Sequence, residues 1–482
     1  MHAFVSLRFA LAFAALFLAA QAGASDSGQD ATPQASQPPL PVLLSQLTDP
    51  AGLRSRLEQQ GVKFTFVYYG DAFDNPNGGI QQGPGYDARF GIIVDANLEK
   101  LAGWTGAAFH ASMQQIHGTQ FSTTHLDNLM LVSGVEAPPS TRLFNLWIEQ
   151  QIGQQASLRF GQFTAAQEFL VSDNADLFVN STFGWPVLNA IDLPSGGPAY
   201  PEATPGVRLQ FTATKELVFR AAVFDGNPAG PGSGNPVLRD PFGVAFRVSD
   251  PPFFIVEVAY DHDQDESGKS DQNQEGQTAA ATLRSKAGTT LPGTIQFGAW
   301  LNTGQFADQR LDALGGLLAQ SGGAPLMHQD NGALYFTFDQ MLWRIPGSTD
   351  QGLNIFWRAE VAPSERNLMD FYVDGGFTFK GMLATRPEDL IGLAFAYGRI
   401  SPQAAAYYRD AALLTGTPVP LPDYEALIEL TYQWKLADKW FVQPDLQYVI
   451  HPGAKLSNPF DPASISIIPN ALVLGLRSVI RF

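Results

Sequence analysis

The last twelve residues, ALVLGLRSVIRF (471–482), carry the pattern that decides the fold. Successive side chains of an extended strand point to opposite faces. One face here is mainly apolar and carries Leu472, Leu474, Leu476, Ile480 and Phe482. The other face carries Val473, Gly475, Arg477 and Arg481. This alternation predicts the closing strand of an outer-membrane barrel, with leucines toward lipid and arginines in the lumen near the periplasmic mouth. A soluble strand with one solvated face shows the same pattern, so the rest of the chain has to decide.

The N-terminal stretch has the form of a secretory signal. Arg8 is followed by an apolar run over residues 9–20 and then by Ala22-Gly23-Ala24, the small-x-small pattern that signal peptidase accepts. The apolar run is too short to span a membrane as a helix. We expect a cleaved signal peptide over residues 1–24, with a retained N-terminal anchor as the alternative.

Composition excludes several classes of protein. After the signal, the sequence contains no apolar run of about eighteen residues, so a chain that crosses a membrane has to cross it with strands. The formal net charge of −17 argues against a nucleic-acid partner, because binding to phosphates requires a basic face. The absence of cysteine excludes a disulfide scaffold, a thiol nucleophile and a cysteine-ligated metal.

Three segments follow the signal. Residues 25–41 are rich in Ser, Gln, Pro and Asp, which predicts a disordered leader. Leucines recur at near-helical spacing in residues 42–60, with Asp49-Pro50 as a helix start and Gly61 as a stop, which predicts a short periplasmic helical segment. From residue 61 to residue 482 the hydrophobic period is two, which predicts an all-β, transmembrane antiparallel β-barrel whose last strand pairs with the first strand near Val62.

Two further features favour a barrel in the membrane. Along the expected strands, one face is apolar and the opposite face holds Arg, Glu, Asp and Gln, whereas a soluble barrel fills its interior with apolar side chains. Short connections at 212–216, 249–252 and 437–439 alternate with long ones at 164–204, 225–241 and 400–423, as periplasmic turns alternate with outer loops. About eighteen periodic segments are present, and sixteen or eighteen strands both remain open. The acidic stretch 261–276 is expected to be a water-exposed, enlarged outer loop.

Several stretches match a known family. They are EQQIGQQASLRFGQFTAAQEFLVSDNADLFVNSTFGWP (149–186), GVKFTFVYYGDAFDNPNGG (61–79), GFTFKGMLATRPEDLIGLAFAYGRIS (376–401) and YEALIELTYQWKLADKWFVQPDLQYVIHPG (424–453). In these stretches the chain resembles the carbohydrate-selective porins of Gram-negative outer membranes, the OprB-type family. The resemblance extends from about residue 43 to residue 482 and implies a sixteen-stranded barrel through which sugars diffuse passively.

A sugar pore needs polar side chains that exchange hydrogen bonds with hydroxyls, and aromatic faces for the apolar side of a pyranose. The inward-facing candidates for a pore constriction are Glu149, Arg159, Arg208 and Arg220. If the loop 164–204 folds into the lumen, it adds Glu168, Asp173, Asn180 and Trp185. Weaker candidates on the opposite wall are Arg358, Glu360 and Glu429. The alternative is that these residues form a solvated wall and that the loop caps the barrel outside.

Other functions are weaker interpretations. A general diffusion porin without sugar selectivity is the first alternative, and an outer-membrane barrel enzyme is the second. The sequence has neither G-x-S-x-G nor H-E-x-x-H, and the aspartates after Asp261 do not follow the EF-hand pattern, so we expect no catalysis, no metal and no cofactor. The expected partners are carbohydrate solutes and outer-membrane lipids, with the chain a monomer or a weak homo-oligomer.

Overall fold

The structure, a computed structural model, describes residues 40–263, 291–416, 419–455, 457–461 and 465–482. The expected signal peptide and nearly all of the expected leader therefore lie outside the described residues. Most of the acidic stretch 261–276 lies outside them as well.

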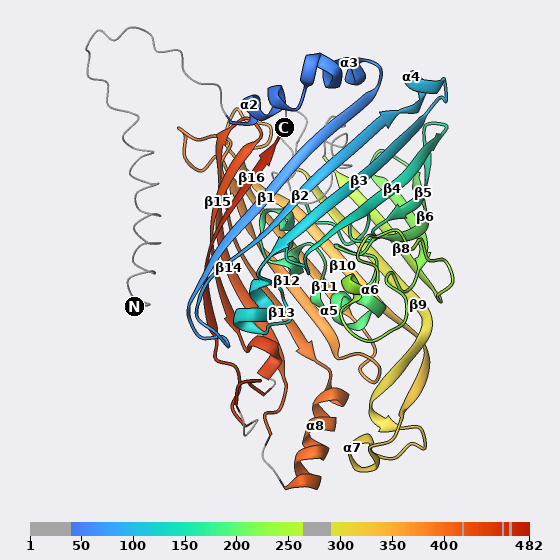
Figure 1. Cartoon of the computed structure of the whole chain (residues 1–482), viewed down its shortest axis with the longest axis vertical. Coiled ribbons are helices and arrows are strands. Elements are labelled where there is room, and N and C mark those ends of the chain that lie inside the picture. The colour runs from blue at the N-terminus through green and yellow to red at the C-terminus, as the bar shows by residue number, and fades with distance from the viewer. Residues whose placement is uncertain (1–39, 264–290, 417–418, 456, 462–464) are drawn as a thin grey trace, which may run out of the picture.

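The described residues form a closed antiparallel barrel of sixteen strands in which each strand pairs with its neighbours in sequence (Figure 1). The strands are β1 (Val62–Asn77), β2 (Gly83–Asn97), β3 (Ala107–Gly118), β4 (Ser140–Ile152), β5 (Ala156–Phe163), β6 (Thr204–Thr212), β7 (Leu217–Asp225), β8 (Pro252–His262), β9 (Gly293–Asp312), β10 (Pro325–Arg344), β11 (Gly352–Val361), β12 (Met369–Lys380), β13 (Leu390–Ile400), β14 (Tyr424–Ala437), β15 (Trp440–Ile450) and β16 (Ala471–Arg481). The count of sixteen settles the open choice between sixteen and eighteen. Strands β9 and β10 are 20 residues long each. The alternation of apolar and polar residues along each of them is therefore long enough to be counted as more than one strand of ordinary length.

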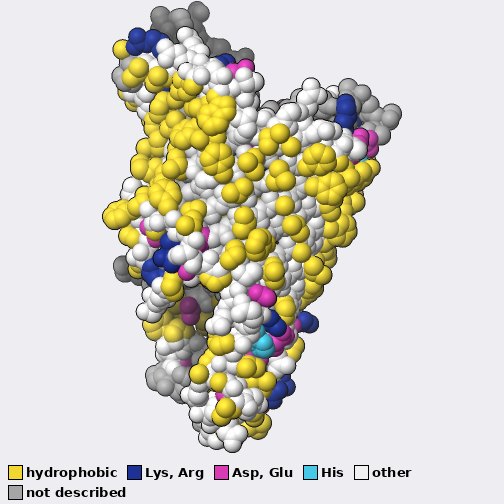
Figure 2. Space-filling model, turned by 90° about the vertical axis from the view of Figure 1, so that its right-hand side faces the viewer, with side chains coloured by type: hydrophobic (Ala, Val, Ile, Leu, Met, Phe, Trp, Pro, Cys, Tyr) yellow, Lys and Arg dark blue, Asp and Glu magenta, His cyan; other side chains and the backbone are white. Residues whose placement is uncertain are grey.

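The closing strand behaves as its sequence predicts. Strand β16 pairs with β1 from Val67↔Arg481 to Asp74↔Leu474 and so seals the sheet. Side chains of β16 alternate between partly exposed and buried positions along most of the strand. On the face shown in Figure 2, hydrophobic side chains cover much of the outer surface of the barrel, and charged side chains lie mainly near the upper rim and in the lower half.

The connections differ in length between the two ends of the barrel. Connections 153–155, 213–216 and 438–439 lie at the end that also carries the C-terminus. The opposite end has the long connections 119–139, 164–203, 226–251 and 401–423.

Two expectations about the connections are wrong. Residues 249–252 are not a separate turn, because β8 begins only at Pro252 and the connection before it starts after Asp225. The acidic stretch does not begin at the long-loop end. Its first residues, 261–263, lie at the end of β8, and β8 and β9 meet at His262↔Gly293 on the same end as the short turns.

The N-terminal helical segment consists of α2 (Leu40–Leu47), a 3-10 turn (Pro50–Gly52) and α3 (Leu53–Gln59). It lies at the end of the barrel that holds the C-terminus (Figure 1). Gly52 is the N-cap of α3, and the Asp49 side chain accepts a hydrogen bond from the Arg54 amide in the first turn at 2.7 Å. Arg54 in turn donates to the Phe64 carbonyl at 3.0 Å and ties the segment to β1.

The other α-helices lie in connections between strands. They are α4 (Leu98–Ala102), α5 (Val187–Asp192), α6 (Pro236–Arg239), α7 (Leu318–Ser321) and α8 (Pro402–Thr415). Only α8 is long, and Ser401 caps it through a hydrogen bond from the Ala404 amide at 3.1 Å. Among the described residues, no helix combines the length and the apolar character that crossing a membrane requires.

The lumen is partly filled by two inward-folded connections, residues 119–139 and 164–203. Phe169, Phe178 and Phe183 of the second connection are almost fully buried and pack against inward side chains of the wall such as Phe356. A carbonyl or amide buried in the lumen needs a partner, so these connections can stay inside only where wall side chains supply one.

Candidate functional site

Carboxylates of the barrel wall hold the connection 164–203 inside the lumen. Glu257 of β8 accepts a hydrogen bond from the Leu170 amide at 3.1 Å. Asp339 of β10 accepts from the Ser172 hydroxyl at 2.8 Å and from the Asn174 side chain at 2.7 Å. The connection therefore folds into the lumen, which the sequence left open.

Two further strands of the wall supply anchors. Glu429 of β14 accepts hydrogen bonds from the Val179 and Asn180 amides at 2.5 and 3.1 Å. Arg358 of β11 donates to the carbonyl oxygens of Leu170 and Thr182, both at 3.1 Å. Each anchor satisfies a buried main-chain group that has no strand partner.

Four charged side chains form a compact network between the connection and the wall. Arg159 of β5 donates to Glu149 of β4 at 2.5 Å and also pairs with Glu168 of the connection. Arg208 of β6 donates to Glu168 at 2.9 Å and to Glu149 at 3.2 Å. Arg208 also donates to the Ser157 hydroxyl at 2.6 Å. Two arginines and two glutamates face each other, so their formal charges cancel.

The strand register explains this network. Glu149 pairs with Arg159 across β4 and β5, and Arg159 pairs with Arg208 across β5 and β6. Side chains of directly opposed residues share one face of a sheet. Two neighbouring arginines would repel each other there, and Glu149 and Glu168 offset that repulsion from both sides.

An aromatic stack supports the network. The Arg159 guanidinium lies 3.8 Å from the ring centroid of Trp147, which is within the range of a cation–π contact. The imidazole of His110 stacks on Trp147 at 4.8 Å, and its Nδ1 lies 2.8 Å from Asp95. These contacts fix the plane of the Arg159 guanidinium.

The network borders a cavity of about 760 Å³ in the lumen. Its wall includes eight of the predicted residues, Glu149, Arg159, Glu168, Asp173, Trp185, Arg208, Arg220 and Arg358. Arg220 pairs with Glu257 at 2.8 Å, and the indole of Trp185 donates to the Gly196 carbonyl at 3.1 Å. Asp173 and Asp176 of the connection also line the cavity, and burial raises the pKa of the Asp176 carboxyl to about 7.

Three predicted residues do not line this cavity. Asn180, Glu360 and Glu429 are almost fully buried, and their side chains bind the connection or the wall. Asn180 donates to the Met130 carbonyl at 3.0 Å, and Glu360 accepts from Asn189 at 3.0 Å. Their side-chain polar atoms are engaged within the protein, so we assign them to holding the connection in place rather than to contacting a solute.

The sequence reasoning missed some residues of the site. Trp147 lies two positions before Glu149 on the same strand face, so the period of two places it in the lumen. Glu257 is flanked by Val256 and Val258, the same signal that identified Arg159. Arg89 also lines the cavity and was overlooked.

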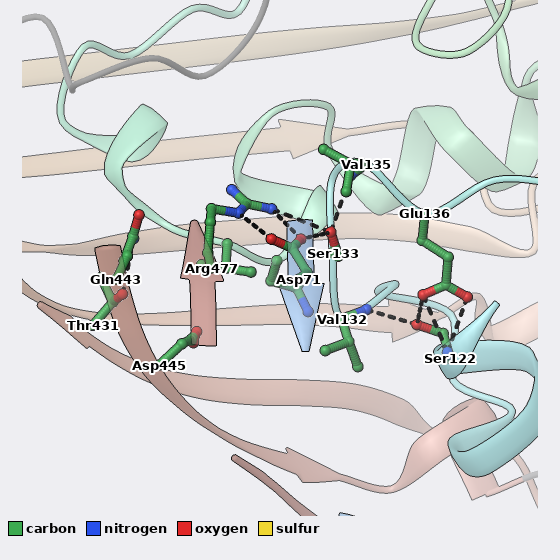
Figure 3. Close-up of polar contacts among 12 residues, drawn as sticks. Asp71, Ser122, Val132, Ser133, Val135, Glu136, Thr431, Gln443, Asp445 and Arg477 are labelled. Atoms are coloured by element: carbon green, nitrogen blue, oxygen red, sulfur yellow. Dashed lines mark hydrogen bonds and ion pairs between the residues drawn. The ribbon is translucent and has the colours of Figure 1, made fainter. Parts of the chain in front are cut away.

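The connection 119–139 is a second element that the sequence reasoning missed. Arg477 of β16 donates to Asp71 of β1 at 2.8 Å, and Asp71 accepts from the Ser133 hydroxyl at 2.6 Å (Figure 3). Arg477 thus faces the lumen as predicted, but it is buried and holds this connection across the barrel seam. The sequence of this connection does contain evidence against a solvated loop. Five of its apolar residues are buried: Phe121, Leu126, Met130, Val132 and Val135.

Glu136 and Ser122 close this second connection on itself. Glu136 accepts from the Ser122 amide at 2.9 Å and from its hydroxyl at 2.6 Å (Figure 3). Burial raises the pKa of the Glu136 carboxyl to about 8; repulsion from Asp87 adds to the shift and the Ser122 hydrogen bonds oppose it. A carboxyl with a raised folded-state pKa contributes stability that is complete below its unfolded pKa and is lost as the pH rises through the folded pKa.

Raising the pH from about 6 to about 9 is therefore expected to loosen residues 119–139. Hydrogen exchange, corrected for the intrinsic rate at each pH, should show lower protection of this segment at the higher pH. Glu136→Gln keeps the size of the side chain and removes the titration, so its protection should change little over the same range. An equal loss of protection in both proteins would contradict the assignment to Glu136.

A closed sixteen-stranded barrel with an apolar outer face and a charged lumen defines the class: an outer-membrane channel. The sequence profile of the carbohydrate-selective porin, OprB family, matches residues 81–482, and the chain belongs to this family. Family and fold indicate a channel rather than an enzyme.

Individual relatives agree with this assignment. Porin B of Pseudomonas aeruginosa is 24% identical over 456 residues, which cover 89% of this chain and 90% of that protein. The high-pH structure of OprB from Pseudomonas putida superposes with a TM-score of 0.75 at 22% identity, over 90% of this chain and 97% of that one. The low-pH structure of the same protein gives a TM-score of 0.51 at 16% identity, over 90% and 97% of the two chains. At these identities the solved structures support the fold alone.

Proposed function

We propose that the protein conducts carbohydrates, in particular monosaccharides such as glucose, by passive diffusion through a constriction at Glu149, Arg159, Glu168 and Arg208. Membership of the carbohydrate-selective porin family supports the solute class. The observation that carries the constriction is the network of two arginines and two glutamates on the wall of the lumen cavity. Arg220, Asp173 and Trp185 extend the same wall.

The chemistry of this wall suits a neutral, hydroxylated solute. Guanidinium groups donate and carboxylates accept hydrogen bonds, so a sugar hydroxyl can exchange water for either group at little net cost. The cancelled formal charge gives no strong preference for cations or anions. The polar groups already satisfy one another, which keeps solute binding weak, and weak binding is what conduction requires.

Osmotic swelling of liposomes that contain the purified chain tests the proposal. Swelling should be faster in glucose than in a neutral amino acid of similar size, such as glutamine. Equal rates in both solutes would leave a general diffusion porin without sugar selectivity. No swelling in either solute, together with ester or peptide turnover, would favour the enzyme instead.

The remaining parts of the proposal concern the mature chain. We propose that cleavage after Ala24 in a Gram-negative bacterium releases the mature protein, that residues 42–60 form a periplasmic helical segment, and that the chain is a monomer or a weak homo-oligomer. N-terminal sequencing of the membrane-extracted protein checks the cleavage site. Light scattering in detergent checks the oligomeric state.

A further inference from the structure

We propose that Arg89 of β2 binds the carboxylate of an acidic monosaccharide, a uronate or an aldonate, in the wall of the lumen cavity. This inference rests on the proposed function, because it names a second substrate class for the same channel. It concerns a part of the wall outside the network of Glu149, Arg159, Glu168 and Arg208.

The position of Arg89 is fixed by two strands and one connection. Arg89 pairs with Tyr69 across β1 and β2, and only 5% of the residue is exposed. Its side chain lines the cavity together with Gly134 and Tyr200. The Tyr200 hydroxyl donates to the Val135 carbonyl at 2.8 Å, so one inward connection holds the other beside Arg89.

Two aromatic rings flank the Arg89 guanidinium. Its central carbon lies 4.6 Å from the ring centroid of Tyr69 and 5.1 Å from that of Tyr200. Cation–π contacts of this kind fix the orientation of the charged plane without using its N–H donors. Arg89 is thus oriented while its donors stay available.

Those donors lack the partners that the other lumen arginines have. Each of the following pairs joins a lumen arginine to a carboxylate: Arg142–Glu202, Arg159–Glu149, Arg208–Glu168, Arg220–Glu257, Arg358–Asp374 and Arg477–Asp71. Within the described parts of the chain, Nε of Arg89 is buried without a hydrogen-bond partner, and the guanidinium lies beside the rings of Tyr69 and Tyr200. A buried charge without a partner is costly, so a ligand that accepts from it is favoured.

The carboxylates nearest in register are already engaged. Asp87, two residues before Arg89, accepts hydrogen bonds from the Gln120 and Phe121 amides at 2.8 and 2.9 Å. Asp71 of β1 is bound by Arg477 and Ser133. Both carboxylates hold the connection 119–139 and leave Arg89 to an outside acceptor.

A carboxylate on a pyranose fits this arrangement. The planar fork of a guanidinium matches a carboxylate with two parallel hydrogen bonds, which a neutral hydroxyl cannot reproduce. The ring of Tyr200 offers an apolar face to the sugar beside it. A neutral sugar offers Arg89 only uncharged hydroxyl oxygens, without the paired geometry of a carboxylate, and should bind more weakly.

Block of ionic current tests the inference with the full chain in planar bilayers. In potassium chloride, potassium glucuronate should reduce the wild-type current at about tenfold lower concentration than glucose does, the factor expected of one charge-assisted contact. In Arg89→Gln, block by glucuronate should weaken about tenfold while block by glucose changes less than twofold. Arg399→Gln, which removes an exposed arginine paired with Asp370 at 2.9 Å, is the matched control and should leave both unchanged.

The outcomes separate this inference from the proposed function. Equal block of the wild type by glucuronate and glucose, or unchanged glucuronate block in Arg89→Gln, would overturn it. If Arg89→Gln does not insert into the bilayer, Arg89→Lys is the test variant. It keeps the charge but loses the paired hydrogen bonds, so glucuronate should block it at a concentration between those expected for the wild type and for Arg89→Gln. Glucuronate block that depends on Arg89, in a protein whose liposomes do not swell in glucose, would uphold the inference and reject the neutral-sugar channel.

Discussion

Replacing Arg358 by alanine is expected to release the connection 164–203 from the wall and to lower the free energy of unfolding by about 3–5 kcal/mol. Arg358 is 1% exposed, pairs with Asp374 and donates to the carbonyl oxygens of Leu170 and Thr182. The substitution leaves the buried Asp374 carboxylate without its cation, with the Tyr372 hydroxyl as a remaining donor, and removes the Arg358 donor from two buried carbonyls. Single-channel conductance should rise severalfold, because the freed connection no longer fills the lumen.

Matched variants show whether burial causes this effect. Arg399→Ala breaks an exposed ion pair with Asp370 and should cost at most about 1 kcal/mol. The double variant Arg358→Met, Asp374→Leu removes both charges and should recover part of the stability while conductance stays high. Urea unfolding followed by tryptophan fluorescence measures the free energy of unfolding. Recordings in planar bilayers measure the single-channel conductance. A stable Arg358→Ala with wild-type conductance would show that Arg358 does not hold the connection.

Single substitutions in the network of Glu149, Arg159, Glu168 and Arg208 are expected to give the channel an ion selectivity of predictable sign. Glu168→Ala leaves two arginines with one glutamate, and the excess positive charge favours anions. Arg208→Ala leaves two glutamates with one arginine and favours cations. Both effects should be large, because charges in a narrow, partly desolvated lumen are only weakly screened.

Reversal potentials in a tenfold gradient of potassium chloride measure this selectivity. Relative to the wild type, the reversal potentials of the two variants should shift in opposite directions, within the limit of about 59 mV for a monovalent ion. Glu216→Ala, at the exposed turn between β6 and β7, provides a control for the removal of one negative charge outside the lumen. Shifts of the same sign in Glu168→Ala and Arg208→Ala would exclude a neutral network at the narrow point.

Much of the fold could be predicted from the sequence because strand faces repeat every two residues. The same regularity correctly placed Glu149, Arg159 and Arg208 on neighbouring lumen faces, since consecutive strands of an antiparallel barrel are also neighbours in space. The closing contact between β16 and β1 follows from this local information, whereas the strand number does not: the periodicity left sixteen or eighteen strands open, and the structure has sixteen.

The contents of the lumen could not be predicted in the same way. Glu425 accepts a hydrogen bond from the Leu129 amide at 3.0 Å, across almost 300 residues of chain. Such pairs depend on how far each connection reaches into the barrel, which no local pattern encodes. The face of β16 that carries Val473 and Arg477 was predicted to line the lumen, but the predicted lumen had no apolar contents. Val473 is buried in one cluster with Phe73 and Phe121, because the connection 119–139 brings its own apolar side chains into the lumen.

Glucose flux relative to glutamine flux, compared between the wild type and the variants Arg159→Ala and Arg208→Ala, is the most direct measurement of how the channel selects its solutes. The constriction predicts that the wild type prefers glucose and that either variant loses most of this preference. It also predicts that thermal stability changes less than solute flux does, because Glu149 and Glu168 each pair with both arginines and keep one ion-pair partner in either variant. An unchanged ratio of glucose to glutamine flux, with only the stability lowered, would contradict the assignment of these arginines to the constriction.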